Sequence, residues 1–537
     1  MAAPFAGGTL RFRRYEALLQ QALQDAVERR GLHLQDVFGS SLDELADAVQ
    51  RHGSAQRQGF EHEQFEGSRR NVGYSVGSHV YYVKPRGRER DNGSLRVVLV
   101  STYDLGHQPF GLASPAAWLR RAGHAVTCAD LACGPLPRAE VRAAALVAFF
   151  LPMHTATRLA ARLLPRVRAL NPRAHLCCYG LYASMNEGWL RELGAASILG
   201  GEFESGLVDL AARLEGGPAP GETRVSLARQ SFLVPDRSTL PPLAAYAHLR
   251  RDGRELPVGY TEATRGCLHL CRHCPVVPVY GGAFRVVQRD VVLADIRQQV
   301  EAGARHITFG DPDFLNGPGH AMALVEAFAD RFPGLTYDVT VKVEHLLRHR
   351  ALLPVLRRTG CLFVTSAVES VDDAVLARLD KGHTRAGFVE LAPVMREAGL
   401  ALAPTFVPFT PWTTREGYRD LLRLIARLDL VENVAPIQLA IRLLIPAGSR
   451  LLELPEVQAL AGPFDRQSLV NPWRHPDPEL DRLSRELQDL VKRQDAAGAT
   501  RTETFARIWA VANDEKPPDF HLPARAAIPY LTEPWYC

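Results

Sequence analysis

From Leu95 onward, apolar runs of strand length alternate with segments of helical length. The runs "LRVVLVSTY", "AVTCAD", "ALVAFFLP", "AHLCCYG" and "ASILGG" are separated by amphipathic stretches such as "TATRLAARLLPRVRAL". Strands that alternate with helices form a parallel sheet that is covered on both faces. We therefore predict an α/β fold with a doubly wound, Rossmann-like domain over residues 94–216. Its ligand crevice is expected at the carboxyl ends of the strands.

The alternation begins again after a proline-rich linker, which we place at residues 217–256. Six further strand candidates follow: "GYTEATRG", "HITFGD", "TYDVTVKV", "CLFVTSAVE", "LAPTFVPF" and "IQLAIRLLIP". With amphipathic helices between them, they predict a partial (β/α)6 TIM-like barrel over residues 257–450. In such barrels the chemistry lies at the carboxyl ends of the strands.

Helical extensions are predicted on either side of these two domains. Residues 1–93 open with helical periodicity and contain a capping-box pattern at Ser41 and Glu44. Residues 451–537 contain the helical stretch "PELDRLSRELQDLVKRQ" and end in the irregular tail "AAIPYLTEPWYC".

Composition excludes several classes of protein. The net charge of +4 is small for 537 residues, so neither a nucleic-acid partner nor a membrane surface is expected. No signal peptide is visible, and no apolar run reaches the roughly 18 residues of a membrane span. The nine cysteines are an odd number and do not suggest a secreted disulfide scaffold. We expect a cytoplasmic protein.

Three cysteines in "TRGCLHLCRHCP" follow the first barrel strand: Cys267, Cys271 and Cys274. A structural zinc site usually uses two separated pairs, or a pair with histidines, and no second pair is present. His269 and His273 lie inside the loop, but a compact loop would hardly bring them to the same ion. Three thiolates from one loop favour a 4Fe–4S cluster with one open iron. Zinc and chance spacing are the alternatives.

The C-x3-C-x2-C spacing after the first strand of a partial barrel resembles the radical S-adenosylmethionine (radical SAM) superfamily. This resemblance implies that S-adenosylmethionine chelates the fourth iron of the cluster. The reduced cluster would then break the sulfonium bond and release a 5′-deoxyadenosyl radical. It also implies a reductant such as flavodoxin or ferredoxin, and a small-molecule or peptide substrate.

The same resemblance implies residues that contact S-adenosylmethionine at the strand ends. The turn "GDPD" would hold the methionyl group, and "VKVEH", "SAVES" and "LLIPAGSRL" would contact the remainder of the cosubstrate. The candidates are Gly310, Asp311, Asp313, Lys342, Glu344, Ser366, Glu369 and Ser370.

The first α/β domain resembles that of the cobalamin-binding subclass. "PFGLASPAAWLRRAGHAVTCAD" and the "GEFE" turn carry this resemblance, which implies bound cobalamin with Gly180, Tyr182 and Ser184 as contacts. The cobalt-ligating motif D-x-H-x-x-G is absent, because Asp104, His107 and Gly111 have another spacing. The resemblance then implies a cobalt without a lower histidine. The alternative is a relic domain that binds nothing.

The tail "EPWYC" resembles the ends of the CUAEP/CCAEP-tail radical SAM (seleno)proteins. That resemblance implies a chain truncated at a selenocysteine codon, with Cys537 as a catalytic thiol. The alternative is a free thiol without a role.

These observations together predict a radical SAM enzyme. Its reaction would be a methylation or rearrangement on an unknown substrate, dependent on cobalamin if the first domain binds it. One alternative is the cobalamin-independent transfer of a 3-amino-3-carboxypropyl group to a soft acceptor. Another is a non-catalytic iron–sulfur redox or sensor protein.

Overall fold

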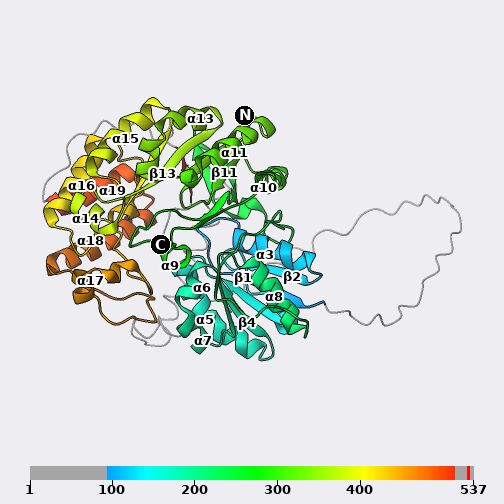
Figure 1. Ribbon diagram of the computed structural model, residues 1–537. Coiled ribbons are helices and arrows are strands. Elements are labelled where there is room, and N and C mark those ends of the chain that lie inside the picture. Colours follow the sequence, from blue (N-terminus) through cyan, green and yellow to red (C-terminus); the bar gives the residue numbers. More distant parts are fainter. Residues whose placement is uncertain (1–93, 514–528, 533–537) are drawn as a thin grey trace, which may run out of the picture. The chain divides into compact units, whose positions relative to one another are not determined.

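In the computed structural model of the protein, residues 94–513 and 529–532 are described (Figure 1). The helical extension that we predict over residues 1–93 lies outside the described residues, and so does Cys537.

A six-stranded parallel sheet forms the first α/β part, as the alternating pattern predicts. Its strand order is β2-β1-β3-β4-β5-β6. The strands are β1 (Arg96–Ser101), β2 (Ala125–Asp130), β3 (Leu146–Phe150), β4 (His175–Tyr179), β5 (Ser197–Gly201) and β6 (Val225–Ser226). The chain reverses its direction of travel across the sheet between β1 and β3. Such a switch point is where open α/β sheets bind ligands.

Helices cover both faces of this sheet, so its central strands are apolar throughout. One face packs on α3 (Phe110–Arg121) and α8 (Glu204–Leu214), and the other packs on α4 (Arg138–Ala143) and α5 (His154–Leu170). Every residue of β3 is buried. Two short helices, α6 (Leu181–Met185) and α7 (Glu187–Glu192), separate β4 from β5.

The predicted linker is more ordered than its proline content indicates. It contains β6, a 3-10 turn η1 (Leu243–Ala245) and a hairpin of β7 (His248–Arg251) and β8 (Arg254–Thr261). Asp252 and Gly253 connect the hairpin with φ of 50° and 72°. Two left-handed residues at a two-residue turn are typical of type I′ hairpins, for which Asp-Gly is a favoured sequence.

A seven-stranded sheet forms the curled half-barrel, in the order β14-β13-β12-β11-β8-β7-β15. The strands β8, β11 (His306–Phe309), β12 (Thr336–Thr340), β13 (Cys361–Glu369) and β14 (Ala401–Phe406) are parallel. The tail strand β15 (Tyr530–Leu531) pairs antiparallel with β7. The α/β fold class that we predicted is therefore confirmed.

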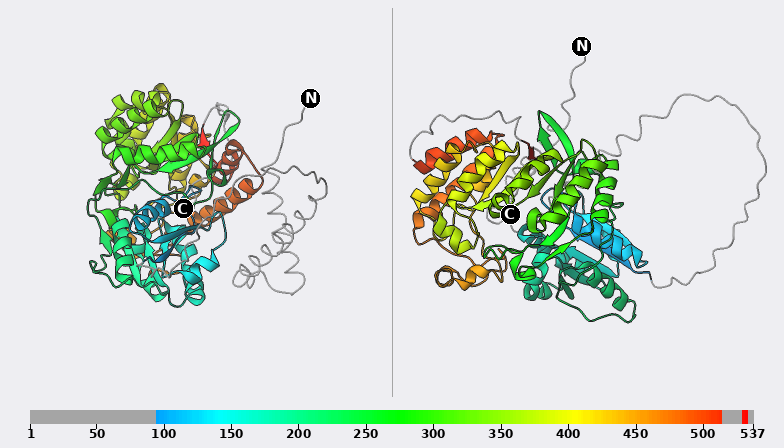
Figure 2. Two further views of the ribbon diagram at one scale, coloured as in Figure 1. Left: turned by 90° about the vertical axis from the view of Figure 1, so that its right-hand side faces the viewer. Right: turned by 45° about the horizontal axis from the view of Figure 1, so that its top comes forward.

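Helices pack on the outer face of the half-barrel around one large apolar core (Figure 2). They are α10 (Arg289–Glu301), α11 (Pro318–Arg331), α12 (Val343–Arg348), α13 (Leu353–Arg358), α15 (Arg385–Glu397) and α16 (Arg415–Arg427). The helix α14 (Asp373–Leu379) contributes Val375 and Leu379 to a smaller apolar cluster. After the barrel come η5 (Arg450–Glu453), α17 (Pro455–Leu460), α18 (Pro478–Ala496) and α19 (Arg501–Asn513). The last two contribute apolar side chains to the same core.

The prediction of a sixth barrel strand at "IQLAIRLLIP" is wrong. The segment forms a 3-10 turn, η4 (Pro436–Leu439), and then a single parallel bridge between Phe409 and Arg442. Side-chain amides, and not the backbone of a sixth strand, form hydrogen bonds with the backbone groups at the edge of β14. Asn433 Nδ2 donates to Leu402 O at 2.7 Å, and Gln438 Oε1 accepts from Phe406 N at 3.1 Å.

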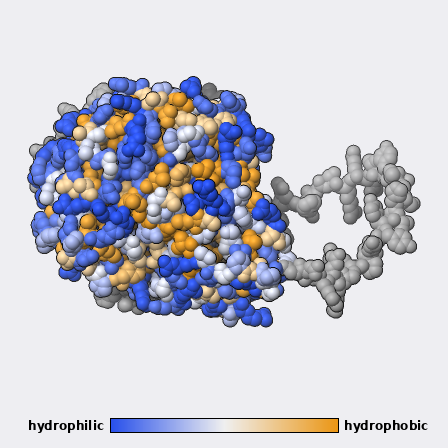
Figure 3. All heavy atoms as spheres, in the orientation of Figure 1, coloured by the Kyte–Doolittle hydropathy of each residue, from blue (hydrophilic) through white to orange (hydrophobic). Residues whose placement is uncertain are grey.

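The described surface is largely hydrophilic on the face drawn in Figure 3, with smaller apolar areas between the polar residues. Within the described ranges, each helix is either too short or too polar to cross a bilayer.

Candidate active site

The three cysteines lie in the loop that follows a short strand, β9 (Thr264–Gly266). Cys267 and Cys271 are buried, and Cys274 is partly exposed. Burial raises the pKa of Cys267, and it raises the pKa of Cys274 to about 12. A thiolate at these positions therefore requires a nearby cation, and iron is a suitable one.

Hydrogen bonds from three separate segments hold the cysteine loop. Asn316 Oδ1 accepts from Leu268 N at 3.2 Å. Arg272 donates its backbone N–H to Leu379 O at 2.9 Å, at the end of α14. Arg450 Nη1 donates to Leu270 O at 2.9 Å. The loop backbone is thus positioned by the protein itself, before any cluster is considered.

Two buried carboxylates from the predicted set lie against histidines of this loop. Asp313 Oδ2 lies 3.2 Å from His269 Nε2 and 2.8 Å from His345 Nδ1. Glu369 Oε1 accepts from His273 Nε2 at 3.2 Å and from Lys381 Nζ at 3.4 Å. Sequence reasoning missed His345 and Lys381 as partners, because neither contact follows from a local spacing: the chain must first fold back after β12 and after β13.

The surroundings of Glu369 keep it ionised. Burial alone would raise the pKa of this carboxyl, but Lys381 and His273 lower it to about 2. Glu369 also has a φ of 66° at the end of β13. A non-glycine residue in this left-handed region is strained, which is common where a side chain is held for function.

The turn after β11 contains Gly310 and Asp311. A Cβ on Gly310 would lie 1.8 Å from the Tyr260 hydroxyl oxygen, so only glycine fits. Asp311 accepts hydrogen bonds from the Thr264 hydroxyl and, at 3.0 Å, from Ala263 N. Burial raises the pKa of Asp311 to about 7. Both carboxyl oxygens already have protein partners, which join this turn to the strand before the cysteines.

The other predicted cosubstrate residues are spread around the barrel. Lys342 is buried, and its Nζ lies 3.7 Å from Glu344 Oε2. Ser370 Oγ accepts from Asp372 N at 3.1 Å. Ser366 is fully buried on β13 and alternates with Thr365 and Ala367, which line the cavity described below, so it lies on the opposite face of the strand.

Gly180, Tyr182 and Ser184 follow β4 in the first sheet. A Cβ on Gly180 would lie 3.0 Å from Leu151 O. Ser184 is buried and donates to Leu181 O at 3.3 Å. The three residues are close together but do not line the main cavity.

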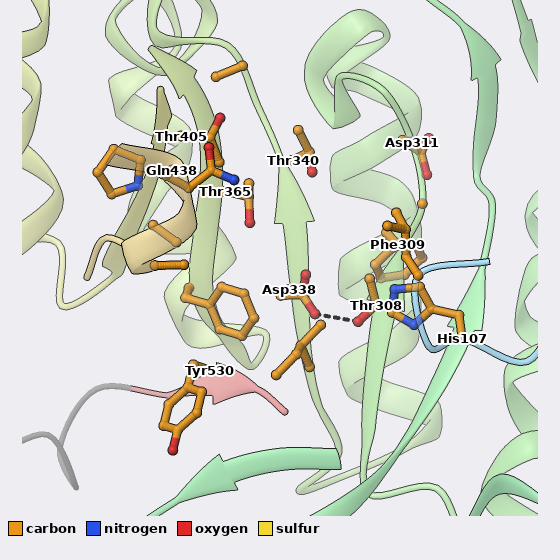
Figure 4. A pocket seen from close by; sticks show the side chains of 18 of the residues that line it. His107, Thr308, Phe309, Asp311, Asp338, Thr340, Thr365, Thr405, Gln438 and Tyr530 are labelled. Atoms are coloured by element: carbon orange, nitrogen blue, oxygen red, sulfur yellow. Dashed lines mark hydrogen bonds between the residues drawn. The ribbon is translucent and has the colours of Figure 1, made fainter. Parts of the chain in front are cut away.

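The main cavity of about 430 Å³ lies inside the half-barrel and has a largely apolar lining (Figure 4). On one side it reaches the ends of β1 and β3, at Asp104, His107 and Met153. Figure 4 shows His107 entering beside Thr308 and Phe309, with Tyr530 of the tail strand at another edge. Sequence reasoning treated Asp104 and His107 only as an incomplete motif and missed their place in this cavity.

Few charged groups line this cavity, and most have partners or are held neutral. Asp338 Oδ2 accepts from Thr308 Oγ1 at 2.6 Å and lies 2.9 Å from His306 Nε2. Burial lowers the pKa of His107 to about 4, although Asp338 opposes this shift. Burial also raises the pKa of Asp104 well above its usual value. The cavity therefore suits a neutral, mostly apolar molecule.

Arg265, two residues before Cys267, connects the two sheets. Its guanidinium lies 2.7 Å from Glu204 Oε1, 3.3 Å from Glu202 Oε2 and 2.6 Å from Glu262 Oε2. The guanidinium also lies over three rings, those of Phe110, Phe203 and Phe232. The "GEFE" turn of the first domain thus reaches the base of the cysteine loop.

Residues 261–425 match the family model of the Radical SAM superfamily. The chain is 26% identical over 200 residues to bacteriochlorophyllide d C-12(1)-methyltransferase of Chlorobaculum tepidum, which covers 36% of this chain and 41% of that protein. It is 24% identical over 252 residues to hopanoid C-3 methylase of Methylococcus capsulatus, which covers 46% of each. The chain spans less than half the length of these curated relatives.

Among solved structures, the chain is similar to the cobalamin-dependent S-adenosylmethionine radical enzyme OxsB with aqua-cobalamin bound. The TM-score is 0.57 at 13% identity, over 75% of this chain and 67% of that one. This likeness shows the fold. Residues 261–425 are therefore assigned as a radical SAM domain, and domains of this family use a 4Fe–4S cluster and S-adenosylmethionine.

Proposed function

We propose that the protein methylates, or rearranges, a carbon centre of a small and largely apolar molecule, using S-adenosylmethionine and cobalamin. The observation that carries this proposal is the continuity of the 430 Å³ cavity. It extends from the switch point of the first sheet, across the barrel interior, to the turn after β11. A ligand of the first domain and a substrate in the barrel would share one space.

Cys267, Cys271 and Cys274 would hold the cluster in this proposal. A 4Fe–4S cluster with S-adenosylmethionine supplies the one-electron cleavage of a sulfonium bond. The loop is fixed by Asn316 and Arg450, so the cluster would meet a preorganised set of thiols. The exposed Leu268 and Leu270 of this loop form a surface on which a reductant such as flavodoxin or ferredoxin would dock.

The cosubstrate would lie between the cysteine loop and the strand ends. Gly310 lets the backbone approach closely, because Tyr260 occupies the space of a side chain. Glu369 and Lys381 supply fixed opposite charges for the amino and carboxylate groups of an amino acid. We keep five residues as proposed contacts of the cosubstrate: Gly310, Asp311, Lys342, Glu369 and Ser370. Asp313 would support the turn that holds the cosubstrate, and Ser366 would lie on the face of β13 that is turned away from the cavity.

The ends of β1 and β3 would bind cobalamin. Cobalamin supplies a carrier for the methyl group when it is bound. The fit rests on the switch point, which opens into the cavity through Asp104, Leu105 and Met153. Gly180, Tyr182 and Ser184 would contact a more distant part of the same cofactor. The similarity to a methyltransferase and a methylase supports methylation, and the similarity to cobalamin-dependent OxsB supports cobalamin.

Product analysis tests this proposal. The anaerobic full-length chain, reconstituted with iron and sulfide, is incubated with S-adenosylmethionine, cobalamin and a reductant, and the nucleoside products are measured by mass spectrometry. We expect 5′-deoxyadenosine and S-adenosylhomocysteine. Cys271→Ala should abolish both, whereas Cys133→Ala, at an exposed cysteine of the first domain, should not.

Other products would contradict parts of the proposal. Methylthioadenosine would favour 3-amino-3-carboxypropyl transfer. Absence of cleavage, or cleavage that persists in Cys271→Ala, would overturn the radical assignment. If the product yield were equal without cobalamin, and no corrin absorbance remained after gel filtration, the enzyme would not use cobalamin and that part of the proposal would be wrong. The catalytic role of Cys537 and the truncation hypothesis stay predictions that the nucleotides after its codon can test.

A further inference from the structure

We infer a second metal site beside the cysteine loop, which binds one divalent transition-metal ion, zinc or ferrous iron, through His269, Asp313 and His345. These side chains come from three segments: the cysteine loop, the turn after β11, and α12. The site is separate from the three thiols. It does not depend on cobalamin or on methyl transfer.

The geometry of the three ligand atoms fits a single ion. His345 Nδ1 and His269 Nε2 lie 2.8 Å and 3.2 Å from Asp313 Oδ2, and the three atoms all lie within 4.8 Å of one another. Ligand atoms that are each about 2.1 Å from a zinc ion, at angles of roughly 90–110°, lie about 3.0–3.4 Å apart. The 3.2 Å separation falls within that range, and the 2.8 Å separation lies just below it.

Burial gives an independent reason for an ion. These three atoms are buried and contact one another, but within the part of the chain that the structure describes none of them has a well-directed hydrogen bond. The side chain of Asp313 is 0% exposed and that of His345 is 6% exposed. A buried polar group without a hydrogen-bond partner is destabilising. One cation would satisfy all three groups at once.

The surroundings also resemble those of metal ligands. Ligating carboxylates and histidines usually make a further contact through their other polar atom. Asp313 Oδ1 accepts from Leu315 N at 3.0 Å. The second ring nitrogen of His269, Nδ1, faces Glu344 Oε2 at 3.9 Å. Two imidazoles and one carboxylate are a ligand set that zinc and ferrous iron accept, with coordination positions left open.

The ion would connect the cysteine loop to the turn proposed to hold S-adenosylmethionine. His269 lies between two cluster cysteines, and Asp313 lies three residues after Gly310. An ion between them would fix the distance from the loop to that turn. Its role is therefore one of positioning.

Metal content tests the inference on the full-length chain with its cluster reconstituted. Zinc, iron and acid-labile sulfide are measured after dialysis for the wild type, His345→Gln and His349→Gln. We expect one zinc beside a four-iron, four-sulfide cluster, or a fifth iron without zinc. His345→Gln should lose that extra ion and keep the cluster. His349→Gln, one helical turn further on, should keep both.

Cobalt(II) provides a second readout that does not depend on activity. With the cluster occupying the thiols, added cobalt should give weak visible d–d bands in the wild type and none in His345→Gln. His345→Cys should restore binding and add a thiolate-to-cobalt charge-transfer band, which decides the matter if His345→Gln folds poorly. A wild type without an extra ion after exposure to zinc, or equal binding in His345→Gln, would overturn the inference.

Discussion

At the scale of single residues, His107 shows how burial sets the charge of the cavity. Its ring stacks on Tyr260 with centroids 4.7 Å apart. The charge of Asp338 acts to raise the pKa of His107. Burial still lowers its pKa to about 4. The imidazole is therefore neutral at pH 7 and gives the cavity a polar atom without a charge.

This shift predicts a pH dependence of stability. The unfolded histidine, with a pKa near 6.5, binds a proton that the folded residue does not accept until about pH 4. The free energy of unfolding should thus fall as the pH drops from 6.5 to 4. Because one proton is involved, the equilibrium constant for folding should fall about tenfold for each pH unit in this range. His107→Phe should remove that slope in urea unfolding series. Parallel curves for wild type and variant would show that the folded histidine titrates normally.

The three cysteines could be selected as a candidate site because they lie at a short local spacing. Asp313 and Glu369 could be selected because the family resemblance implies polar residues at these strand ends. Their contacts with His345 and Lys381 could not be predicted, since these depend on how the chain folds back after β12 and β13. The cavity role of His107 depends likewise on tertiary packing.

At the scale of elements, the strands of the first sheet follow directly from their apolar runs. Elements whose pairing depends on a neighbour were harder to predict. "IQLAIRLLIP" has strand-like residues, but Asn433 and Gln438 already satisfy the edge that it would extend. The β7–β8 hairpin has an Asp252-Gly253 turn, a sequence typical of hairpins, but the charged residues around it do not have the apolar alternation of strands.

The turn after β11 yields a prediction about one methyl group. In Gly310→Ala the new Cβ would overlap the half-buried Tyr260 ring, on which His107 stacks. Overpacking of this kind costs about 1–3 kcal/mol. We expect a lower urea midpoint and loss of S-adenosylmethionine cleavage.

A matched glycine provides the control for this change. Gly319 in α11 has open space around its Cβ position. Gly319→Ala should leave cleavage intact and change stability by at most about +1 kcal/mol. If Gly310→Ala behaved like Gly319→Ala, the close approach of Tyr260 would not matter for the turn.

At the scale of the described molecule, the two sheets are joined by buried polar contacts as well as by the chain. Arg237 binds Asp295 on α10 at 2.8 Å and also donates to Gln108 Oε1, near the end of β1, at 2.7 Å. Arg265 makes the more extensive connection, because Glu202 and Glu204 come from the first domain and Glu262 from the second. Burial raises the pKa of Glu202 to about 7, while Arg265 lowers the pKa of Glu204 against the effect of burial.

Removing the Arg265 guanidinium should lower the stability of both the first domain and the half-barrel. Arg265→Met would leave three carboxylates near one another without their cation, and breaking a buried ion pair in this way costs about 3–5 kcal/mol. Arg251→Ala, at an exposed ion pair of the hairpin turn, should cost at most about 1 kcal/mol. Urea unfolding measures the difference, and hydrogen exchange locates it. We expect faster exchange in β5 and in the cysteine loop alike. Faster exchange in only one of them would mean that Arg265 supports a single domain and that the two sheets are coupled elsewhere.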